Sequence, residues 1–176
     1  MTTVTTIRLE RPDDIPAIRL VNELAFGRPN EANIVDSLRE NGKAILSLVA
    51  EVEGSVVGHV LFSPARFEPQ QPQVRALALG PLAVRPDYQR KGLGSLLVQD
   101  GLDRCRRLGI HCVLLLGNPA YYSRFGFGSA VERAISPPPG SPPGAVRAFQ
   151  IIELQTGVLE LGPLTGYEAE EFDIYG

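Results

Sequence analysis

The chain has 176 residues, of which 44% are hydrophobic and 21% charged, and its formal net charge is −3. These proportions are those of a folded globular protein and exclude an intrinsically disordered one. The slightly acidic balance argues against a nucleic-acid partner, which would require clustered lysine and arginine. No apolar run approaches the ~20 residues that cross a bilayer, and Met1–Val4 lacks the pattern of a signal peptide, so we expect no membrane partner.

The first half of the chain predicts a strand, two helices and a hairpin, in that order. A strand over Ile7–Glu10 precedes apolar residues at helical spacing, which begin near Ile15 and again near Asn30. Two strands, Ile45–Val52 and Ser55–Ser63, are separated by a short turn.

The second half predicts a strand ending at Val84, a helix over residues 93–108, a strand over Ile110–Leu116, a short helix and a strand over Ala148–Leu154. Gly101 in the middle of the long helix costs about 1 kcal/mol relative to alanine, which close packing against the sheet would explain. This order of elements predicts an α+β sandwich, with helices on both faces of a mixed sheet.

We expect residues 1–176 to form a single domain. Pro137–Gly144 is too rich in proline for regular structure and is either a surface loop or a lid over a pocket. The acidic C-terminal segment, residues 166–176, is interpreted as a solvated tail.

The segment Arg85–Ser95 has the features of a phosphate-binding loop. It connects an apolar strand to a helix, and Gly92 and Gly94 let the backbone approach a ligand closely. Free N–H groups at the helix start, together with the charges of Arg90 and Lys91, favour an anion there.

Three kinds of phosphate loop have glycine patterns of this type. A dinucleotide fingerprint needs a third glycine, which Ser95–Leu97 does not supply, and a nucleoside-triphosphate loop needs lysine after its last glycine, whereas Lys91 precedes the pair. Gln89–Gly94 instead resembles the pyrophosphate loop, Gln/Arg-x-x-Gly-x-Gly/Ala, of the GCN5-related N-acetyltransferases (GNAT). Alternatively, the glycines form an ordinary turn before a core helix.

A second segment strengthens the resemblance. Tyr122–Phe127 is similar to the Tyr-x-x-x-Gly-Phe signature of the same family, and it follows the loop in the expected order. The sequence of residues 117–127 resembles the sequences of the YhbS-like subgroup of N-acetyltransferases. The resemblance extends over most of Ile7–Leu154 and does not include the chain from Gln155 onward.

The resemblance implies the GNAT fold, which has a mostly antiparallel central sheet splayed between its fourth and fifth strands. It also implies an acetyl-CoA-dependent N-acetyltransferase, in which an amine attacks the thioester directly. The residues that it assigns to coenzyme A are Leu82, Ala83, Val84, Gln89, Arg90, Lys91, Gly92, Leu93, Gly94, Ser95, Asn118 and Tyr122.

By the same resemblance, Tyr122 is the general acid that protonates the departing thiolate. Tyr121 is the alternative, because adjacent helical residues face different directions and only one of them can reach the sulfur. Asn118 is equally well explained as a helix cap ahead of Pro119.

Two residues are candidates for the general base, His59 and Glu31. His59 lies in an apolar strand, where it could point into the acceptor cleft or be a core histidine bonded to backbone. Glu31, near the start of the second helix, belongs to a segment that borders the acceptor site in the family, but it also suits the charge of a helix start.

A non-catalytic acyl-CoA-binding sensor of the same fold is the alternative function. The acceptor is expected to be a small-molecule or peptide amine, and a homodimer is compatible with the sequence. Cys105 and Cys112 are interpreted as reduced and buried, which fits a cytoplasmic location, and with His59 and His111 far apart in sequence no metal site is expected.

Overall fold

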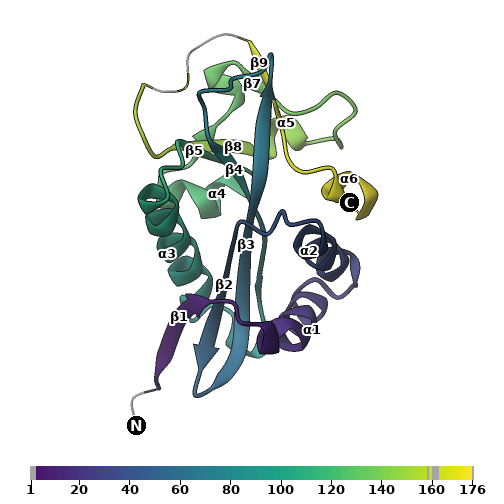
Figure 1. Ribbon diagram of the computed structural model, residues 1–176, viewed down its shortest axis with the longest axis vertical. Coiled ribbons are helices and arrows are strands. Elements are labelled where there is room, and N and C mark those ends of the chain that lie inside the picture. Colours follow the sequence, from purple (N-terminus) through teal and green to yellow (C-terminus); the bar gives the residue numbers. More distant parts are fainter. Residues whose placement is uncertain (1–2, 158, 160–162, 176) are drawn as a thin grey trace. The chain divides into compact units, whose positions relative to one another are not determined.

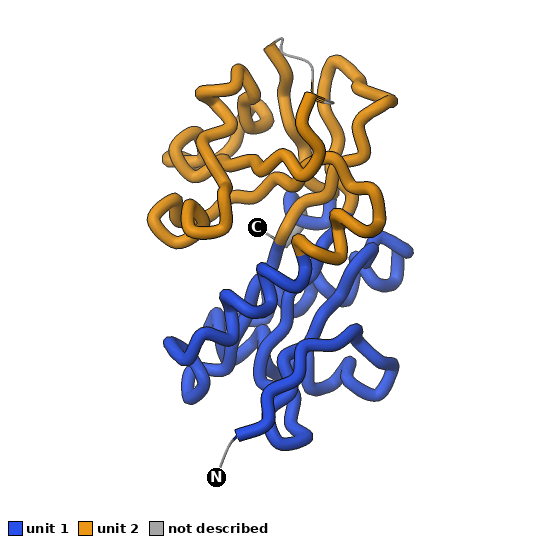
Figure 2. Tube along the Cα trace, turned by 90° about the vertical axis from the view of Figure 1, so that its left-hand side faces the viewer, with its two compact units in different colours: residues 1–63, 80–101, 170–176 blue, residues 64–79, 102–169 orange. Residues whose placement is uncertain are grey.

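The computed structural model describes residues 3–157, 159 and 163–175. The chain forms two compact units, each built from separate stretches of sequence (Figure 2). Unit 1 comprises Met1–Ser63, Gly80–Gly101 and Glu170–Gly176, and unit 2 comprises Pro64–Leu79 and Leu102–Ala169. The single domain expected over residues 1–176 stays a prediction.

The sheet of unit 1 contains three antiparallel strands and, beside β3 (Ser55–Glu68), the second part of β4 (Ala76–Val84), from Gly80 onward (Figure 1). β1 (Thr5–Leu9) pairs with β2 (Leu46–Val52), and β2 pairs with the first part of β3. The predicted strands are confirmed, although β3 continues beyond Ser63 to Glu68. β2 and β3 are apolar runs, mostly buried on both faces and separated by the turn at Glu53–Gly54, which is why the sequence located them well.

Helices cover both faces of this sheet, as predicted (Figure 1). Phe62 of β3 points at α3 (Leu93–Arg107), where its ring lies beside Gly101. His59 lies three residues earlier and therefore points to the opposite face, where it contacts Asn22 of α1 (Ile15–Phe26). α2 (Asn30–Glu40) packs beside α1, to which the ion pair between Arg19 and Asp36, 2.6 Å, connects it.

Close packing explains Gly101, as the sequence predicted. A Cβ atom at Gly101 would come within 2.5 Å of two ring atoms of Phe62. At this distance the ring would have to move, and Phe62 is fully buried. The bare backbone of Gly101 is therefore what lets α3 approach the sheet.

Replacing Gly101 with alanine is expected to destabilise the protein by about 1–3 kcal/mol, because overpacking outweighs the gain in helix propensity. Denaturant unfolding measures this change. Gly128→Ala is the matched control, since a Cβ at Gly128 meets nothing within 4 Å. A Gly101→Ala variant as stable as the wild type would contradict the packing explanation.

Unit 2 contains the end of β3, the first part of β4 and the strands and short helices between Leu102 and Ala169. β4 (Ala76–Val84) runs parallel to β5 (Cys112–Leu116), which is antiparallel to β8 (Phe149–Glu153), and β8 pairs with β6 (Gly128–Ser129). The end of β3 pairs with β9 (Leu164–Tyr167), which is parallel to β7 (Ile135–Ser136). The short helices of this unit are α4 (Pro119–Tyr122) and α5 (Ala145–Ala148). Residues 137–144, between β7 and α5, contain only turns and irregular backbone.

The parallel pairing of β4 with β5 is brief. Its register covers Ala76–Ala78 opposite Cys112–Leu114, whereas β4 continues to Val84. The two strands therefore part after Ala78, which confirms the predicted splay between the fourth and fifth strands of a mixed sheet.

The interpretation of residues 166–176 as a solvated tail is wrong. Gly166 and Tyr167 belong to β9, and α6 (Glu171–Tyr175) packs in unit 1 against α2. Glu171 is 2% exposed and accepts hydrogen bonds from Asn41 Nδ2 (2.8 Å) and Lys43 Nζ (3.1 Å). A charge run is usually solvated, but here a lysine and an amide far upstream compensate for the buried carboxylate.

Within the described residues, no helix has both the length and the apolar character needed to cross a membrane. The same part of the chain contains no group of three or more His, Cys, Asp or Glu side chains arranged to hold a metal ion. Cys105 and Cys112 are free and buried.

Candidate functional site

The loop that precedes α3 is tied back to the end of β4. Gln89 donates from Nε2 to the carbonyl oxygen of Val84 (2.9 Å), and Lys91 Nζ donates to the carbonyl oxygen of Asp87 (2.9 Å). Arg85 and Lys91 both lie over the ring of Tyr88, at 5.3 and 5.1 Å from its centre. These contacts hold the loop against the end of β4.

The backbone of this loop has the geometry of an anion cradle. Arg90 has φ 58° and Gly92 has φ 84°, so left-handed residues alternate with ordinary ones just before α3 begins at Leu93. Such alternation makes successive N–H groups converge, and the first turn of a helix adds N–H groups that have no intrahelical acceptor. A Cβ at Gly92 would meet nothing within 4 Å, so the space in front of it is open to a ligand.

Leu82–Val84 lies directly upstream of this loop, on the part of β4 that follows its pairing with β5. Ala83 is buried, and Gly58 of β3 packs beside it, since a Cβ at Gly58 would be 3.5 Å from the carbonyl oxygen of Ala83. β3 is the neighbour of β4 on one side, and on the other side the peptide groups of this segment lie outside the β5 register, where they could pair with amide groups of a ligand.

Tyr122 lies in unit 2, on the short helix α4. Its ring packs edge-on against Tyr121 (centroids 4.9 Å apart) and Phe127 (5.8 Å). Burial, and to a lesser extent the neighbouring Tyr121, raises the pKa of the Tyr122 phenol to about 12. Tyr122 therefore keeps its proton throughout the physiological range and can act only as a donor of that proton.

Asn118 caps α4, as its alternative interpretation predicted. Its side-chain oxygen accepts a hydrogen bond from the backbone N–H of Ala120 (3.0 Å), and Pro119 occupies the first helical position. Its assignment to coenzyme A stays a prediction.

Tyr121 is held by a different set of contacts from Tyr122. The guanidinium of Arg124 lies over its ring, 4.5 Å from the centre, and Arg124 Nε donates to its carbonyl oxygen (2.9 Å). Tyr121 thus packs between an arginine and the ring of Tyr122.

His59 is a fully buried histidine of unit 1, and side chains rather than backbone hold it. Asn22 Nδ2 donates to the carbonyl oxygen of Ile18 (3.0 Å), so the same nitrogen must also be the donor to His59 Nδ1 (3.2 Å). Nε2 then carries the ring proton and donates it to Ser47 Oγ (2.9 Å). Both ring nitrogens are hydrogen-bonded to neighbouring side chains, so the structure supports the core-histidine interpretation. Neither nitrogen is left to face an amine that would accept the acetyl group.

Burial lowers the pKa of His59 to about 4, well below the value near 6.5 in an unfolded chain. As the pH falls from about 6.5 to 4, the unfolded state therefore binds a proton that the folded state does not bind, and the free energy of unfolding decreases. We expect the wild type to lose up to about 3 kcal/mol more over this range than His59→Gln, which cannot titrate. Denaturant unfolding at a series of pH values measures the difference, and parallel curves would contradict it.

Glu31 lies in the first turn of α2, where its carboxylate forms an ion pair with Arg28. The Glu31 side chain is only 12% exposed, whereas that of Arg28 is 56% exposed. Both carboxylate oxygens of Glu31 accept hydrogen bonds from Arg28 Nε (3.1 and 3.2 Å).

A model of the acetyltransferase (GNAT) family matches residues 12–127. The chain belongs to this family. It is 39% identical over 154 residues to a protein named "Uncharacterized N-acetyltransferase YhbS" from Escherichia coli (strain K12), and the match covers 87% of this chain and 89% of that relative.

Two solved GNAT structures are similar over almost the whole chain. That of YhbS from Escherichia coli in complex with CoA has a TM-score of 0.90 at 34% identity and covers 100% of this chain and 96% of the other. That of a GNAT family acetyltransferase from Brucella melitensis in complex with acetyl-CoA has a TM-score of 0.76 at 34% identity and covers 94% and 97%. The predicted family, its YhbS-like subgroup and the fold class are confirmed.

Sequence reasoning included Gly117 in the family-like segment of this GNAT chain but missed its packing against Tyr122. A Cβ at Gly117 would lie 2.6 Å from a ring atom of Tyr122, so only glycine leaves room for the ring in its observed position. The sequence contained one signal, a glycine between the end of β5 and the cap of α4, but a glycine there is also common in simple turns.

Proposed function

We propose that this chain is an acetyl-CoA-dependent N-acetyltransferase that transfers the acetyl group to a primary amine by direct attack. The observation that carries the proposal is the loop ahead of α3, with left-handed backbone at Arg90 and Gly92 and open space in front of Gly92. Such a loop suits a diphosphate, which coenzyme A contains. The CoA complexes of the two similar structures support the same ligand.

In the proposed reaction, the thioester supplies the acetyl group and a thiolate leaving group. The amine nitrogen bonds to the carbonyl carbon while the carbon–sulfur bond breaks. Tyr122 gives its phenolic proton to the sulfur. Its raised pKa keeps the phenol protonated at neutral pH, so that this proton is present when the thiolate leaves. Glu31, or a water molecule beside it, takes the proton that the amine nitrogen loses. We also infer a reducing, cytoplasmic setting, because both cysteines are free and buried.

Thermal unfolding of the full chain with acetyl-CoA, ATP or NAD tests ligand binding. Acetyl-CoA at 100 times its dissociation constant should stabilise the protein by about 2.7 kcal/mol, a rise in Tm of roughly 5–10 °C, whereas ATP and NAD should not. No stabilisation by acetyl-CoA would overturn the proposal.

Release of free CoA thiol with a panel of amines then tests turnover. Amine-dependent thiol release supports the enzyme. Stabilisation by acetyl-CoA without release for any amine of the panel supports the sensor, which the occupied ring nitrogens of His59 and the ion-paired Glu31 would explain.

A further inference from the structure

The C-terminal helix α6 brings an aromatic ring against β4 within unit 1. A Cβ atom at Gly80 would lie 4.0 Å from Cε1 of Phe172, so the half-buried Phe172 ring bounds the space that a side chain at this position would enter. Gly80 is two residues beyond Ala78, the last residue of β4 that pairs with β5, and two residues before Leu82. The ring therefore lies at the start of the part of β4 that β5 leaves unpaired.

Buried polar contacts fix the position of this ring. Phe172 directly follows Glu171, which is 2% exposed. The Glu171 carboxylate accepts hydrogen bonds from Asn41 Nδ2 (2.8 Å) and Lys43 Nζ (3.1 Å), and Lys43 also donates to Glu170 (3.2 Å). A buried carboxylate is costly without such partners, so α6 keeps the orientation in which these contacts are made.

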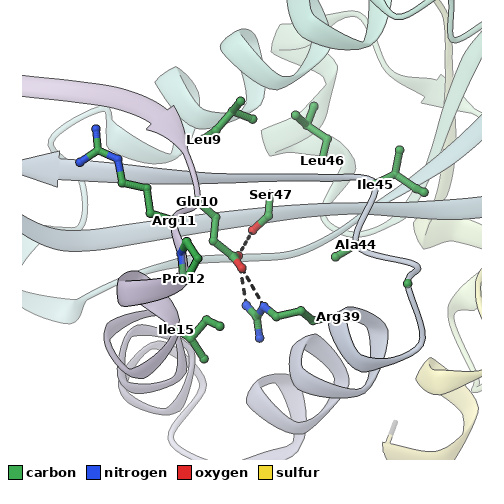
Figure 3. A pocket seen from close by; sticks show the side chains of 11 residues that line it. Leu9, Glu10, Arg11, Pro12, Ile15, Arg39, Ala44, Ile45, Leu46 and Ser47 are labelled. Atoms are coloured by element: carbon green, nitrogen blue, oxygen red, sulfur yellow. Dashed lines mark hydrogen bonds and ion pairs between the residues drawn. The ribbon is translucent and has the colours of Figure 1, made fainter.

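The support of α6 is itself tied to the sheet. α6 packs against α2, and Arg39 lies in the last turn of α2. Arg39 donates from Nε (2.7 Å) and Nη2 (3.0 Å) to Glu10, which also accepts a hydrogen bond from Ser47 of β2 (Figure 3). Phe172 is consequently carried by a well-connected part of unit 1.

α6 and α3 lie on opposite faces of the sheet of unit 1 (Figure 1). Phe62 of β3 points at α3, whereas His59 points at α1, beside which α2 packs. Since α6 packs against α2, it belongs to the face of α1 and α2. A coenzyme A molecule whose diphosphate lies at the start of α3 therefore approaches β4 from the face opposite Phe172.

The proposed function sets the direction of the pantetheine arm. With the diphosphate before α3 and the arm along Leu82–Val84, the thioester comes toward Gly80, which is roughly 13 Å from Val84 at ~3.3 Å per strand residue. Straight ahead, the pairing of Ala76–Ala78 with β5 closes the way. An acyl chain longer than acetyl must then turn toward the face of α6, where it meets Phe172.

We infer that Phe172 restricts the acyl donor of this chain to short acyl groups, and that Glu171 positions Phe172 through its hydrogen bonds. The inference rests on the proposed function and adds a determinant of acyl specificity to it. Phe172 is a specificity residue that takes no part in proton transfer, and Glu171 acts only through it.

Calorimetric titration of the full chain with CoA, acetyl-CoA and hexanoyl-CoA, without an acceptor amine, tests the inference. The wild type should bind CoA and acetyl-CoA with similar affinity and hexanoyl-CoA at least about tenfold more weakly, because overpacking against a fixed ring is unfavourable. Phe172→Ala should bind hexanoyl-CoA at least about tenfold more tightly than the wild type does, since each methylene removed from water contributes about fourfold in affinity. Its affinity for acetyl-CoA should change little.

Two further variants separate the ring from its surroundings. Leu20→Ala is the control, because it truncates an apolar side chain of α1 that is 51% exposed, and it should leave all three affinities unchanged. Glu171→Ala should relax the selectivity in the same direction as Phe172→Ala, since α6 loses the carboxylate that anchors it. If Phe172→Ala does not fold, Phe172→Leu, which also shortens the side chain, decides the question.

Equal affinity of the wild type for acetyl-CoA and hexanoyl-CoA would overturn the inference while leaving the proposed function intact. A preference for acetyl-CoA that survives Phe172→Ala would do the same. Absence of binding by CoA and by both acyl-CoA molecules would instead overturn the proposed function, and the inference with it.

Discussion

Replacing Tyr122 with phenylalanine is expected to lower kcat for acetyl transfer by a factor of about 10²–10⁴, the usual contribution of a positioned general acid. The substitution removes one hydroxyl and keeps the ring that packs against Tyr121 and Phe127. The dissociation constant for acetyl-CoA should therefore change little, and the loss should fall on kcat.

Tyr121→Phe is the matched control, because it removes the same atom from the neighbouring ring. Its kcat should stay within a few-fold of the wild type, since the ring of Tyr121 packs beneath Arg124. Steady-state rates of thiol release and the affinity for acetyl-CoA are measured for both variants. The opposite result would reverse the assignment: Tyr122→Phe would stay active, and Tyr121→Phe would show the loss of kcat that is expected here for Tyr122→Phe.

The pH dependence gives a second readout of the same residue. Since burial raises the pKa of Tyr122 to about 12, its ionisation should not reduce kcat below about pH 10. Any decline of the wild-type rate between pH 8 and 10 should consequently persist in the residual activity of Tyr122→Phe, which lacks this hydroxyl. A wild-type decline that is absent from Tyr122→Phe would show that Tyr122 titrates earlier than its burial implies.

Several elements of the fold were predictable because their signals are local. The strands on either side of Glu53–Gly54 are apolar runs separated by a turn, and the structure has β2 and β3 there. Gly101 was also predictable, since a glycine in the middle of an amphipathic helix needs a packing reason and Phe62 supplies it. The order of the loop and the tyrosine segment identified the family before any geometry was known.

Features that depend on distant partners were not predictable. Glu171 lies in an acidic run that resembles a solvated tail, and only the fold reveals that Asn41 and Lys43 bond to it. His59 likewise has apolar neighbours in sequence, whereas its partners Asn22 and Ser47 come from other elements. A single sequence contains no local signal for such pairings, so the base could not be chosen.

Gly92→Asp is expected to weaken acetyl-CoA binding about 100-fold or more, whereas Gly92→Asn should bind far better than Gly92→Asp. Gly92 has φ 84°, a conformation that Asn and Asp tolerate better than other side chains, so the two variants share a shape and a backbone cost. Their difference is one negative charge in the open space before α3, and repulsion between unit charges about 4 Å apart near a protein surface amounts to ~4 kcal/mol. Calorimetric titration of both variants with acetyl-CoA measures the difference, and the salt dependence of the Asp variant should be the steeper because screening weakens a repulsion between exposed charges. If both variants bind equally, no phosphate lies in front of Gly92, and the loop must then hold its ligand through side chains such as Arg90 rather than through its backbone.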